Sequence, residues 1–407
     1  MTKTIATQCC IAGGGPAGMM LGLLLARAGV DVVVLEKHAD FLRDFRGDTI
    51  HPSTLEVMHE LGLLDRLLEL PHQKITRLSA AFGERTLAFV DMTHLPTRCK
   101  FIALMPQWDF LNFLAEEGAR YPGFKLIMRA EAEATIVESG RVAGVAANAP
   151  DGGLEIRARL TVAADGRHSV LRARSGFDIE ELGAPMDVLW FRLARRVGDS
   201  DQIMGRFGAG SLFVMLNRGD YWQCGFVIAK GSIAKVQAQG LPAFRKRIVD
   251  LAPFMAGRAE EIADWSQVKL LTVAVDRATV WHKPGMLLIG DAAHAMSPIG
   301  GVGINLAIQD AVAAANILWA PLAHGCLDQS HLAQVQKRRE FPTRFIQAVQ
   351  LVMQRNIIAR ALDAGAATRP PWTVRLIASM PPFRRIPARL FGMGVRPEHV
   401  LSPEAPR

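Results

Sequence analysis

The stretch Gly13-Gly14-Gly15-Pro16-Ala17-Gly18 decides how the N-terminal part of this chain folds. It follows a β-branched, apolar run at residues 4–12 and precedes an apolar run at residues 19–28, which Gly29 ends. A Val-rich run at residues 31–35 comes next. Runs of this composition with these boundaries predict a buried strand, a tight turn, a helix and a second strand.

The spacing of the glycines in this unit is typical of a turn that binds a dinucleotide. Gly13 allows the tight turn, Gly15 lets the backbone approach a pyrophosphate, and Gly18 lets the helix pack closely on the strand. Pro16 suits the first helical turn, and the N-terminus of a helix offers free N–H groups to phosphates. Glu36 follows Gly18 by 18 residues, where a carboxylate binds ribose hydroxyls and disfavours a 2′-phosphate. The unit therefore predicts FAD or NAD as the bound dinucleotide, rather than a glycine-rich turn without a ligand.

The bulk composition indicates an ordinary globular protein. A chain of 407 residues with 50% hydrophobic content has ample core for two domains. The uncharged run between Lys3 and Arg27 could suggest a signal peptide or a membrane span, but the Gly-Pro break within it argues against both. The five cysteines have no C-x-x-C spacing and indicate packing residues in a reducing cytoplasm, with no metal site.

The net charge of +8 comes largely from the C-terminal tail. From Arg369 onward the chain has seven Arg, no Lys and two Glu. A charge that a tail largely supplies argues against a nucleic-acid-binding face. We expect the tail to form a helix that packs over the rest of the chain or at a dimer contact, with a membrane-surface element as the alternative.

The middle of the chain predicts more strands and a second ligand-binding turn. Residues 107–118 form an amphipathic pattern behind Pro106 and predict a helix. Asp165-Gly166 ends an apolar run, and ligands bind at such strand ends in parallel sheets. The predicted strands before this turn are residues 75–82, 85–91, 101–105, 125–128, 132–137, 142–147 and 154–163.

Residues 184–275 have a different pattern, with longer strands that are rich in aromatic residues and predict a mostly antiparallel sheet. Its predicted strands are residues 188–196, 211–216, 221–228 and 268–275. One face of this sheet is either plain core or the roof of a flat apolar pocket. The residues that we expect to bind substrate in the second case are Trp190, Phe213, Met215, Tyr221 and Gln223.

Residues 281–322 predict a second glycine-rich helix N-terminus. A short apolar strand ends at Gly290-Asp291, and the run 299–305, Ile-Gly-Gly-Val-Gly-Ile-Asn, leads into an apolar helix. Such a helix end stabilises negative charge.

Three motifs in a fixed order make this chain similar to a known family. They are Gly13-x-Gly15-x-x-Gly18 with Glu36, Asp165-Gly166 with Arg172, and Gly290-Asp291 with Pro298 and residues 300–305. Over residues 5–320 the chain resembles the FAD-dependent aromatic hydroxylases of the p-hydroxybenzoate hydroxylase type, the class A flavoprotein monooxygenases. The W-x-W-x-I-P motif of the similar flavin halogenases does not occur.

The resemblance implies a role for each matching position. Glu36 would bind the adenosine ribose, Asp165 would lie near the pyrophosphate, and Asp291 would bind the ribityl chain. Pro298, Gly301 and Arg46 would act at the reaction centre by shaping the loop and positioning the flavin, with no side-chain acid or base assigned. The expected cofactor-binding residues are Gly13, Gly15, Pro16, Ala17, Gly18, Glu36, Lys37, Arg46, Gln107, Asp165, Gly290, Asp291, Pro298, Gly301, Gly303, Ile304 and Asn305.

The resemblance also implies a reaction. NAD(P)H would reduce the flavin, O₂ would add at C4a, and the resulting hydroperoxide would hydroxylate an aromatic or conjugated small molecule. The alternative is an FAD-dependent reductase or dehydrogenase that transfers hydride without oxygen insertion. A binding protein that has lost its chemistry is disfavoured, because the acidic residues and the glycine loop are intact.

The expected fold is α/β. Residues 1–74, 97–183 and 276–330 would form a discontinuous Rossmann-like FAD-binding domain with a parallel sheet and a meander. Residues 75–96 and 184–275 would form the antiparallel substrate-binding sheet, and residues 331–407 a C-terminal helical segment with its basic tail. We expect a cytoplasmic monomer or homodimer without stable membrane insertion.

Overall fold

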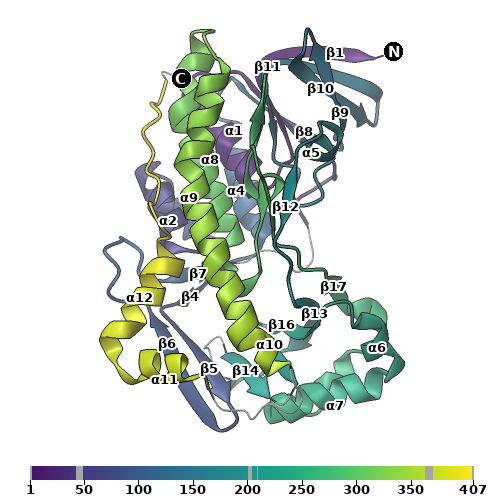
Figure 1. Ribbon diagram of the computed structural model, residues 1–407, viewed down its shortest axis with the longest axis vertical. Helices are drawn as coiled ribbons and strands as arrows, with labels where there is room; N and C mark the ends of the chain where they lie inside the picture. Colours follow the sequence, from purple (N-terminus) through teal and green to yellow (C-terminus); the bar gives the residue numbers. More distant parts are fainter. Residues whose placement is uncertain (1, 43–48, 200–203, 209, 363–369, 406–407) are drawn as a thin grey trace.

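The computed structural model describes residues 2–42, 49–199, 204–208, 210–362 and 370–405. Two sheets lie toward opposite ends of an elongated molecule, and helix α9 (Gln329–Met353) runs along most of its length (Figure 1). The parallel sheet, the mostly antiparallel sheet and the C-terminal helices confirm the predicted fold class.

The first sheet has a parallel centre, in which β1 pairs with β2 on one side and with β11 on the other. β9 and β10 form the predicted meander, in which β10 pairs antiparallel with β11 and β9 pairs antiparallel with β10. The strands of this sheet are β1 (Lys3–Ala12), β2 (Val32–Glu36), β8 (Phe124–Met128), β9 (Glu131–Glu138), β10 (Arg141–Ala149), β11 (Gly152–Ala163), β19 (His282–Lys283) and β20 (Met286–Leu288).

A helical layer covers one face of this sheet. Helix α1 (Pro16–Arg27) packs against α4 (Gln107–Gly118) and α8 (Gly303–Ala323), and their apolar side chains form one buried core with the sheet. Residues 299–323 are long and apolar enough to cross a membrane, but 72% of the apolar window is buried inside the protein. α8 is therefore a core helix of this layer.

The second sheet has the order β17-β13-β16-β15-β14-β5-β6 and is antiparallel except between β14 and β5. Strand β14 was not predicted from the sequence, and the predicted strand 268–275 is shorter. The bounds are β5 (Arg77–Phe82), β6 (Arg85–Asp91), β13 (Met186–Ala194), β14 (Met204–Gly208), β15 (Ser211–Asn217), β16 (Tyr221–Ala229) and β17 (Lys269–Leu271). One face packs against α7 (Leu241–Leu251) through a cluster of aromatic rings, so that the other face is left for the cavity described below.

The remaining elements lie in the connections between strands and in the C-terminal segment. Predicted strand 101–105 pairs within a small sheet rather than within either large one. The smaller elements are β3 (Thr49–Ile50), β4 (Gln73–Ile75), β7 (Ile102–Leu104), β12 (Ile179–Glu181), β18 (Asp276–Ala278), β21 (His294–Ala295), α2 (Pro52–Glu60), α3 (Leu64–Leu67), α5 (Val170–Arg174), α6 (Ile233–Ala238), α10 (Ala359–Ala361), α11 (Trp372–Ser379) and α12 (Pro381–Gly392).

Candidate cofactor and substrate cavity

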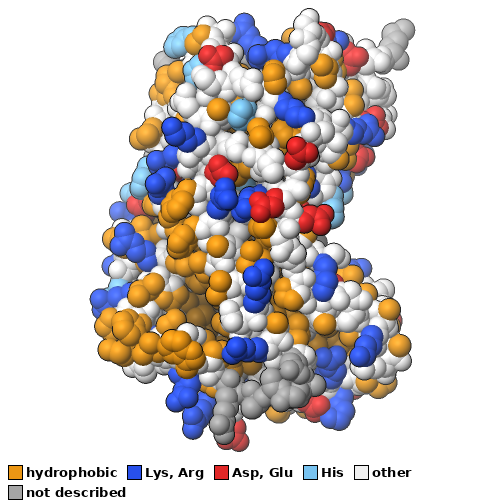
Figure 2. Space-filling view, in the orientation of Figure 1, with side chains coloured by type: hydrophobic (Ala, Val, Ile, Leu, Met, Phe, Trp, Pro, Cys, Tyr) orange, Lys and Arg blue, Asp and Glu red, His pale blue; other side chains and the backbone are white. Residues whose placement is uncertain are grey.

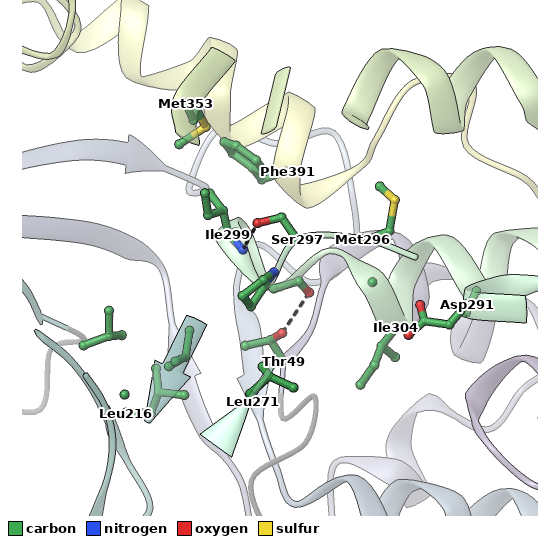
Figure 3. A pocket seen from close by; sticks show the side chains of 18 of the residues that line it. Thr49, Leu216, Leu271, Asp291, Met296, Ser297, Ile299, Ile304, Met353 and Phe391 are labelled. Atoms are coloured by element: carbon green, nitrogen blue, oxygen red, sulfur yellow. Dashed lines mark hydrogen bonds between the residues drawn. The ribbon is translucent and has the colours of Figure 1, made fainter. Parts of the chain in front are cut away.

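One continuous cavity of about 1070 Å³ runs from the glycine turn before α1 to the free face of the second sheet. Figure 3 shows part of it, with Asp291 and Ile304 toward one end, Leu216 toward the other, and Thr49 and Leu271 between them. The C-terminal helices contribute Phe391 and Leu390 to its wall. The cavity therefore joins the two sheets and the C-terminal segment.

The glycine turn leaves an open space beside Gly15. A Cβ atom built on Gly15 meets no atom within 4 Å, whereas one on Gly18 would lie 2.0 Å from the carbonyl oxygen of Gly13. Gly15 is the N-cap of α1 and no side chain caps this helix end. Gly18 is thus required by packing, and Gly15 keeps space free in front of unpaired N–H groups, as a phosphate requires.

Glu36 is buried at the end of β2 and is tied to the same turn. Its carboxylate accepts hydrogen bonds from the backbone N–H of Gly14 at 3.1 Å and of His38 at 3.0 Å. Lys37 beside it lies 3.9 Å from Glu131 in an exposed ion pair. Both Glu36 and Lys37 line the cavity.

Asp165 follows β11 and presents a buried oxygen to this end of the cavity. Its Oδ2 accepts hydrogen bonds from the N–H groups of Val170 at 2.9 Å and Leu171 at 3.3 Å. Its Oδ1 is buried and has no hydrogen-bond partner among the residues that the structure describes. Burial raises the pKa of the carboxyl above its usual range, although these hydrogen bonds oppose the shift. A buried acceptor without a partner is rare, and here it indicates a ligand donor.

Asp291 and Arg167 face each other across the cavity wall, where the carboxylate of Asp291 lies 3.4 Å from the guanidinium of Arg167. Both side chains are partly exposed and both line the cavity. Asp291 follows Gly290, whose N–H donates to the buried carboxylate of Asp310 at 3.1 Å. The strand end therefore fixes where Asp291 stands.

The glycine loop before α8 is held by its backbone geometry and by β3. Gly300 and Gly301 have φ angles of 79° and 63°, which side-chain-bearing residues rarely adopt. The hydroxyl of Thr49 donates to the carbonyl of Gly301 at 2.9 Å, the dashed bond beside Thr49 in Figure 3. α8 then begins at Gly303 without a side-chain cap, and Gly303 lines the cavity.

Asn305 lies behind this loop and connects it to α2. Its side-chain oxygen accepts from the N–H of His51 at 2.9 Å and the hydroxyl of Thr54 at 2.8 Å. Its amide group donates to the carbonyls of Thr49 and Gly301, each at 3.2 Å. The side chain thus holds the loop from behind rather than lining the cavity.

The free face of the second sheet forms the apolar end of the cavity. Trp190 on β13 covers Gly225 on β16, where an added Cβ would lie 3.1 Å from the indole ring. Gln223 is buried on this face and accepts a hydrogen bond from Arg218 at 3.1 Å. The apolar residues of this sheet that line this end include Leu78, Phe82, Val188, Leu212, Val214, Leu216, Val227 and Leu271.

Three of the predicted substrate residues lie outside the cavity lining. Phe213 and Met215 lie on the opposite face of β15, in the aromatic core that packs against α7. Tyr221 begins β16, its ring lies beneath the guanidinium of Arg192 at 4.9 Å, and it is outside the cavity lining. Alternating side chains of one strand point to opposite faces, which explains why Val214 and Leu216 replace the predicted pair.

The other predicted residues divide into three groups. Gly18, Gly290 and Asn305 pack behind the lining, and Arg46 lies outside the described residues. Those that line the cavity are Gly13, Gly15, Pro16, Ala17, Glu36, Lys37, Gln107, Asp165, Asp291, Pro298, Gly301, Gly303, Ile304, Trp190 and Gln223.

Sequence reasoning missed the end of α9 and the C-terminal helices as parts of the cavity wall. The apolar spacing of these helices is visible in the sequence, but nothing in it says which surface they cover. The lining residues from these segments are Val349, Val352, Met353, Asn356, Ile357, Ile358, Arg360, Pro371, Trp372, Thr373, Val374, Ile377, Ile386, Pro387, Leu390 and Phe391.

A buried charged group supports the cofactor end from behind. Asp310 accepts from His294 at 2.6 Å and from Arg339 at 3.0 Å, and Arg339 also reaches Glu398 at 3.2 Å. Burial alone would raise the pKa of Asp310, but the pairs with His294 and Arg339 outweigh it and hold the pKa below its usual range. This group links the strand end at Gly290, α8, α9 and the C-terminal tail.

The site agrees with the relationships that the chain shows to known proteins. The family described as FAD binding domain matches residues 6–349. 6-Methylpretetramide 4-monooxygenase of Streptomyces rimosus is 31% identical over 386 residues, which cover 94% of this chain and 92% of that protein. Rifampicin monooxygenase of Streptomyces venezuelae is 28% identical, and the match covers 79% of this chain and 66% of that protein.

Solved structures show the same fold. PqsL of P. aeruginosa in complex with 2-aminobenzoylacetate has a TM-score of 0.76 at 22% identity, covering 89% of this chain and 99% of that one. OxyS anhydrotetracycline hydroxylase from Streptomyces rimosus has a TM-score of 0.75 at 22% identity, covering 96% and 77%.

The cavity thus defines a dinucleotide-binding flavoprotein. The open space at Gly15, the uncapped start of α1 and the unpartnered Oδ1 of Asp165 all fit bound FAD. The chain belongs to the FAD binding domain family. It is an FAD-dependent monooxygenase, an oxidoreductase for which NAD(P)H is the usual reductant of the family.

Proposed function

We propose that this enzyme hydroxylates a large, apolar, conjugated aromatic molecule, using NAD(P)H and O₂, with the substrate lying on the free face of the second sheet. The observation that carries the proposal is the single cavity that joins the cofactor end to this face. Within the described lining, carboxylates occur only at the cofactor end, at Glu36, Glu131, Asp165 and Asp291. The sheet end therefore favours an apolar molecule without a positive charge.

The relatives support a conjugated substrate of this size. Their names specify 6-methylpretetramide, rifampicin and anhydrotetracycline. The wall of Trp190, Val214 and Leu216 offers flat apolar surface, and Gln223 offers the polar group that would fix orientation. We infer that an extended ring system fits this end.

The roles of the cofactor residues complete the proposal. Glu36 would bind the adenosine ribose, with Lys37, Gln107 and Arg46 as further contacts. Asp165 would accept a hydrogen bond near the pyrophosphate, and Asp291 one from the ribityl chain. FAD, when bound, supplies the redox chemistry with oxygen, and the protein supplies binding and orientation.

The loop and the sheet would provide the environment for that chemistry. The uncapped N-terminus of α8 at Gly303 stabilises negative charge that develops beside Pro298 and Gly301. The apolar wall excludes water from the same place.

We also propose the division into a discontinuous FAD-binding domain, residues 1–74, 97–183 and 276–330, and a substrate-binding domain, residues 75–96 and 184–275.

The decisive experiment measures NAD(P)H oxidation, O₂ uptake and product together, in a screen of multi-ring phenols and quinones. A true substrate should accelerate NAD(P)H oxidation, consume one O₂ per product, and carry label from ¹⁸O₂. Conversion at full rate without oxygen, with no label in the product, would assign the chain to the reductases instead.

A further inference from the structure

Helices α11 and α12 form a hairpin whose outer surface is both apolar and basic. Among the described residues of this hairpin, Trp372 is 73% exposed, Ile386 65%, Met380 47% and Leu376 45%. Exposed large apolar side chains that gather in one place mark an interaction surface, whereas single ones do not.

This surface lies at the mouth of the cavity. Trp372 and Ile386 line the cavity and yet remain mostly exposed, so they stand where the cavity opens. Figure 2 shows apolar side chains gathered over the corner of the molecule that α11 and α12 form in Figure 1, beside a hollow. The apolar rim therefore continues from the cavity wall onto the outer surface.

The charge on the hairpin has one sign. Five arginines and no acidic residue lie between Pro370 and Pro397. Arg375 and Arg389 are exposed, and neither forms an ion pair or a side-chain hydrogen bond with another described residue. Arg375 is one helical turn from Trp372 on α11, and Arg389 is one helical turn from Ile386 on α12, so charge and apolar surface share the outer face.

We propose that α11 and α12 dock on the surface of an anionic lipid bilayer and set the mouth of the cavity against it. Short amphipathic helices with arginines beside Trp, Leu and Ile bind at such surfaces, where the apolar side chains enter the headgroup region and the arginines meet lipid phosphates. A bilayer also holds apolar molecules of the class proposed as substrate, so docking gives them a path into the cavity. Only this last point rests on the proposed function.

The charge argues against a second copy of this chain as the partner. A symmetric contact through this surface would bring the arginines of one copy against those of the other, because equivalent patches meet across a twofold axis. Like charges without acidic partners oppose that contact, whereas anionic headgroups complement them.

The test is co-sedimentation of the full-length, FAD-loaded protein with vesicles. Vesicles of phosphatidylcholine mixed with phosphatidylglycerol should bind the protein, vesicles of phosphatidylcholine alone should bind it weakly, and high salt should release it. The double variant Arg375→Gln, Arg389→Gln should lose about 25-fold in partitioning, because each basic residue at the surface contributes about fivefold.

Matched variants make the result specific. Leu376→Ser with Met380→Ser should also lose binding, because both side chains are exposed and neither lines the cavity. Lys235→Gln with Lys269→Gln removes the same charge from α6 and β17, on the other side of the molecule in Figure 1, and should bind as wild type.

Three outcomes would overturn the proposal. Equal binding to neutral and anionic vesicles, or wild-type binding by the Arg375→Gln, Arg389→Gln variant, would show that the hairpin is not a docking site for anionic lipid. A dimer in lipid-free buffer that the Leu376→Ser, Met380→Ser variant abolishes would assign the surface to a second copy. Product formation from substrate added in lipid-free buffer, measured separately, decides the proposed function whichever way the vesicle experiment falls.

Discussion

Gly15 and Gly18 belong to one turn but have different roles, and substitutions distinguish these roles. Gly15→Val places a side chain in the open space before α1, so the apoprotein should fold and yet be purified without FAD. Gly18→Val would drive a side chain into the Gly13 carbonyl, so it should lower the melting temperature of the apoprotein. Visible flavin absorbance of the purified variants and thermal unfolding of the apoprotein distinguish the two, and stoichiometric FAD in Gly15→Val would contradict the assigned site.

The buried carboxylate of Asp165 is a second single-residue feature with a testable consequence, because its charge is unfavourable without a ligand. The pKa of Asp165 is raised in the folded state, so ionisation of its carboxyl lowers the free energy of unfolding of the apoprotein. This lowering begins near pH 4, the usual pKa of an aspartate, and grows as the pH rises. Asp165→Asn should therefore stabilise the apoprotein at pH 7, and the gain should shrink as pH falls toward 4.

Denaturant unfolding of apo wild type and Asp165→Asn at several pH values measures this effect. A gain that is constant with pH would show that the charge is not its cause. The same variant should bind FAD more weakly, since an amide presents a donor where the unpartnered oxygen faces the ligand.

At the scale of elements, α12 is attached to α2 through one buried histidine. His51 Nδ1 lies 2.6 Å from the carbonyl oxygen of Phe391, and burial lowers the pKa of His51 to about 4. A depressed histidine pKa means that the folded state resists protonation, so stability falls as pH decreases from about 6.5 to about 4.

This pH dependence is a measurable prediction. Wild type should lose about 1.4 kcal/mol of unfolding free energy per pH unit from this residue between pH 6.5 and 4. His51→Asn keeps a donor for the Phe391 carbonyl and should show a shallower slope by that amount. Identical slopes for both proteins, measured by urea unfolding, would exclude His51 as the source.

Pairing between elements also explains what the sequence could not predict about the substrate face. Alternation along β16 separates Gln223 from Trp222 and Cys224, and Gln223 lines the cavity. Its cross-strand neighbour on β15 is Leu216, whereas Phe213 opposes Phe226 on the core face. Deciding whether Val214 and Leu216 or Phe213 and Met215 share the face of Gln223 requires the register between β15 and β16. That register depends on tertiary pairing rather than on the pattern of either strand.

The dinucleotide turn was predictable because its chemistry is local. Gly13, Gly15 and Glu36 lie in one local unit of strand, turn, helix and second strand, and their spacing alone specifies the unit. The wall formed by α11 and α12 was not predictable, because it depends on where a segment far along the chain returns.

At the scale of the whole molecule, the C-terminal tail completes the buried charged group behind the cofactor end. Glu398 is 6% exposed and accepts from Arg339, which is 1% exposed and shared with Asp310. Glu398→Ala should cost about 1.5–3 kcal/mol of unfolding free energy, because a buried guanidinium loses a charged partner.

Glu340→Ala is the matched control, since its ion pair with Arg344 is an exposed i,i+4 contact of α9 and contributes little. Chemical unfolding of both variants against wild type checks the difference. Equal, small effects for the two variants would show that Arg339 is satisfied by Asp310 alone.

The same tail sets an order of events during biosynthesis. Arg27 at the end of α1 donates to the carbonyl of Ser402, 375 residues later, and accepts from the N–H of Ala405. Asn316 of α8 accepts from the N–H groups of Leu401 and Ser402. The end of α1 therefore completes these hydrogen bonds only when a segment 375 residues further along the chain has been made. A nascent chain without this segment leaves these groups of α1 and α8 without their partners, and such unfinished surfaces favour misfolding.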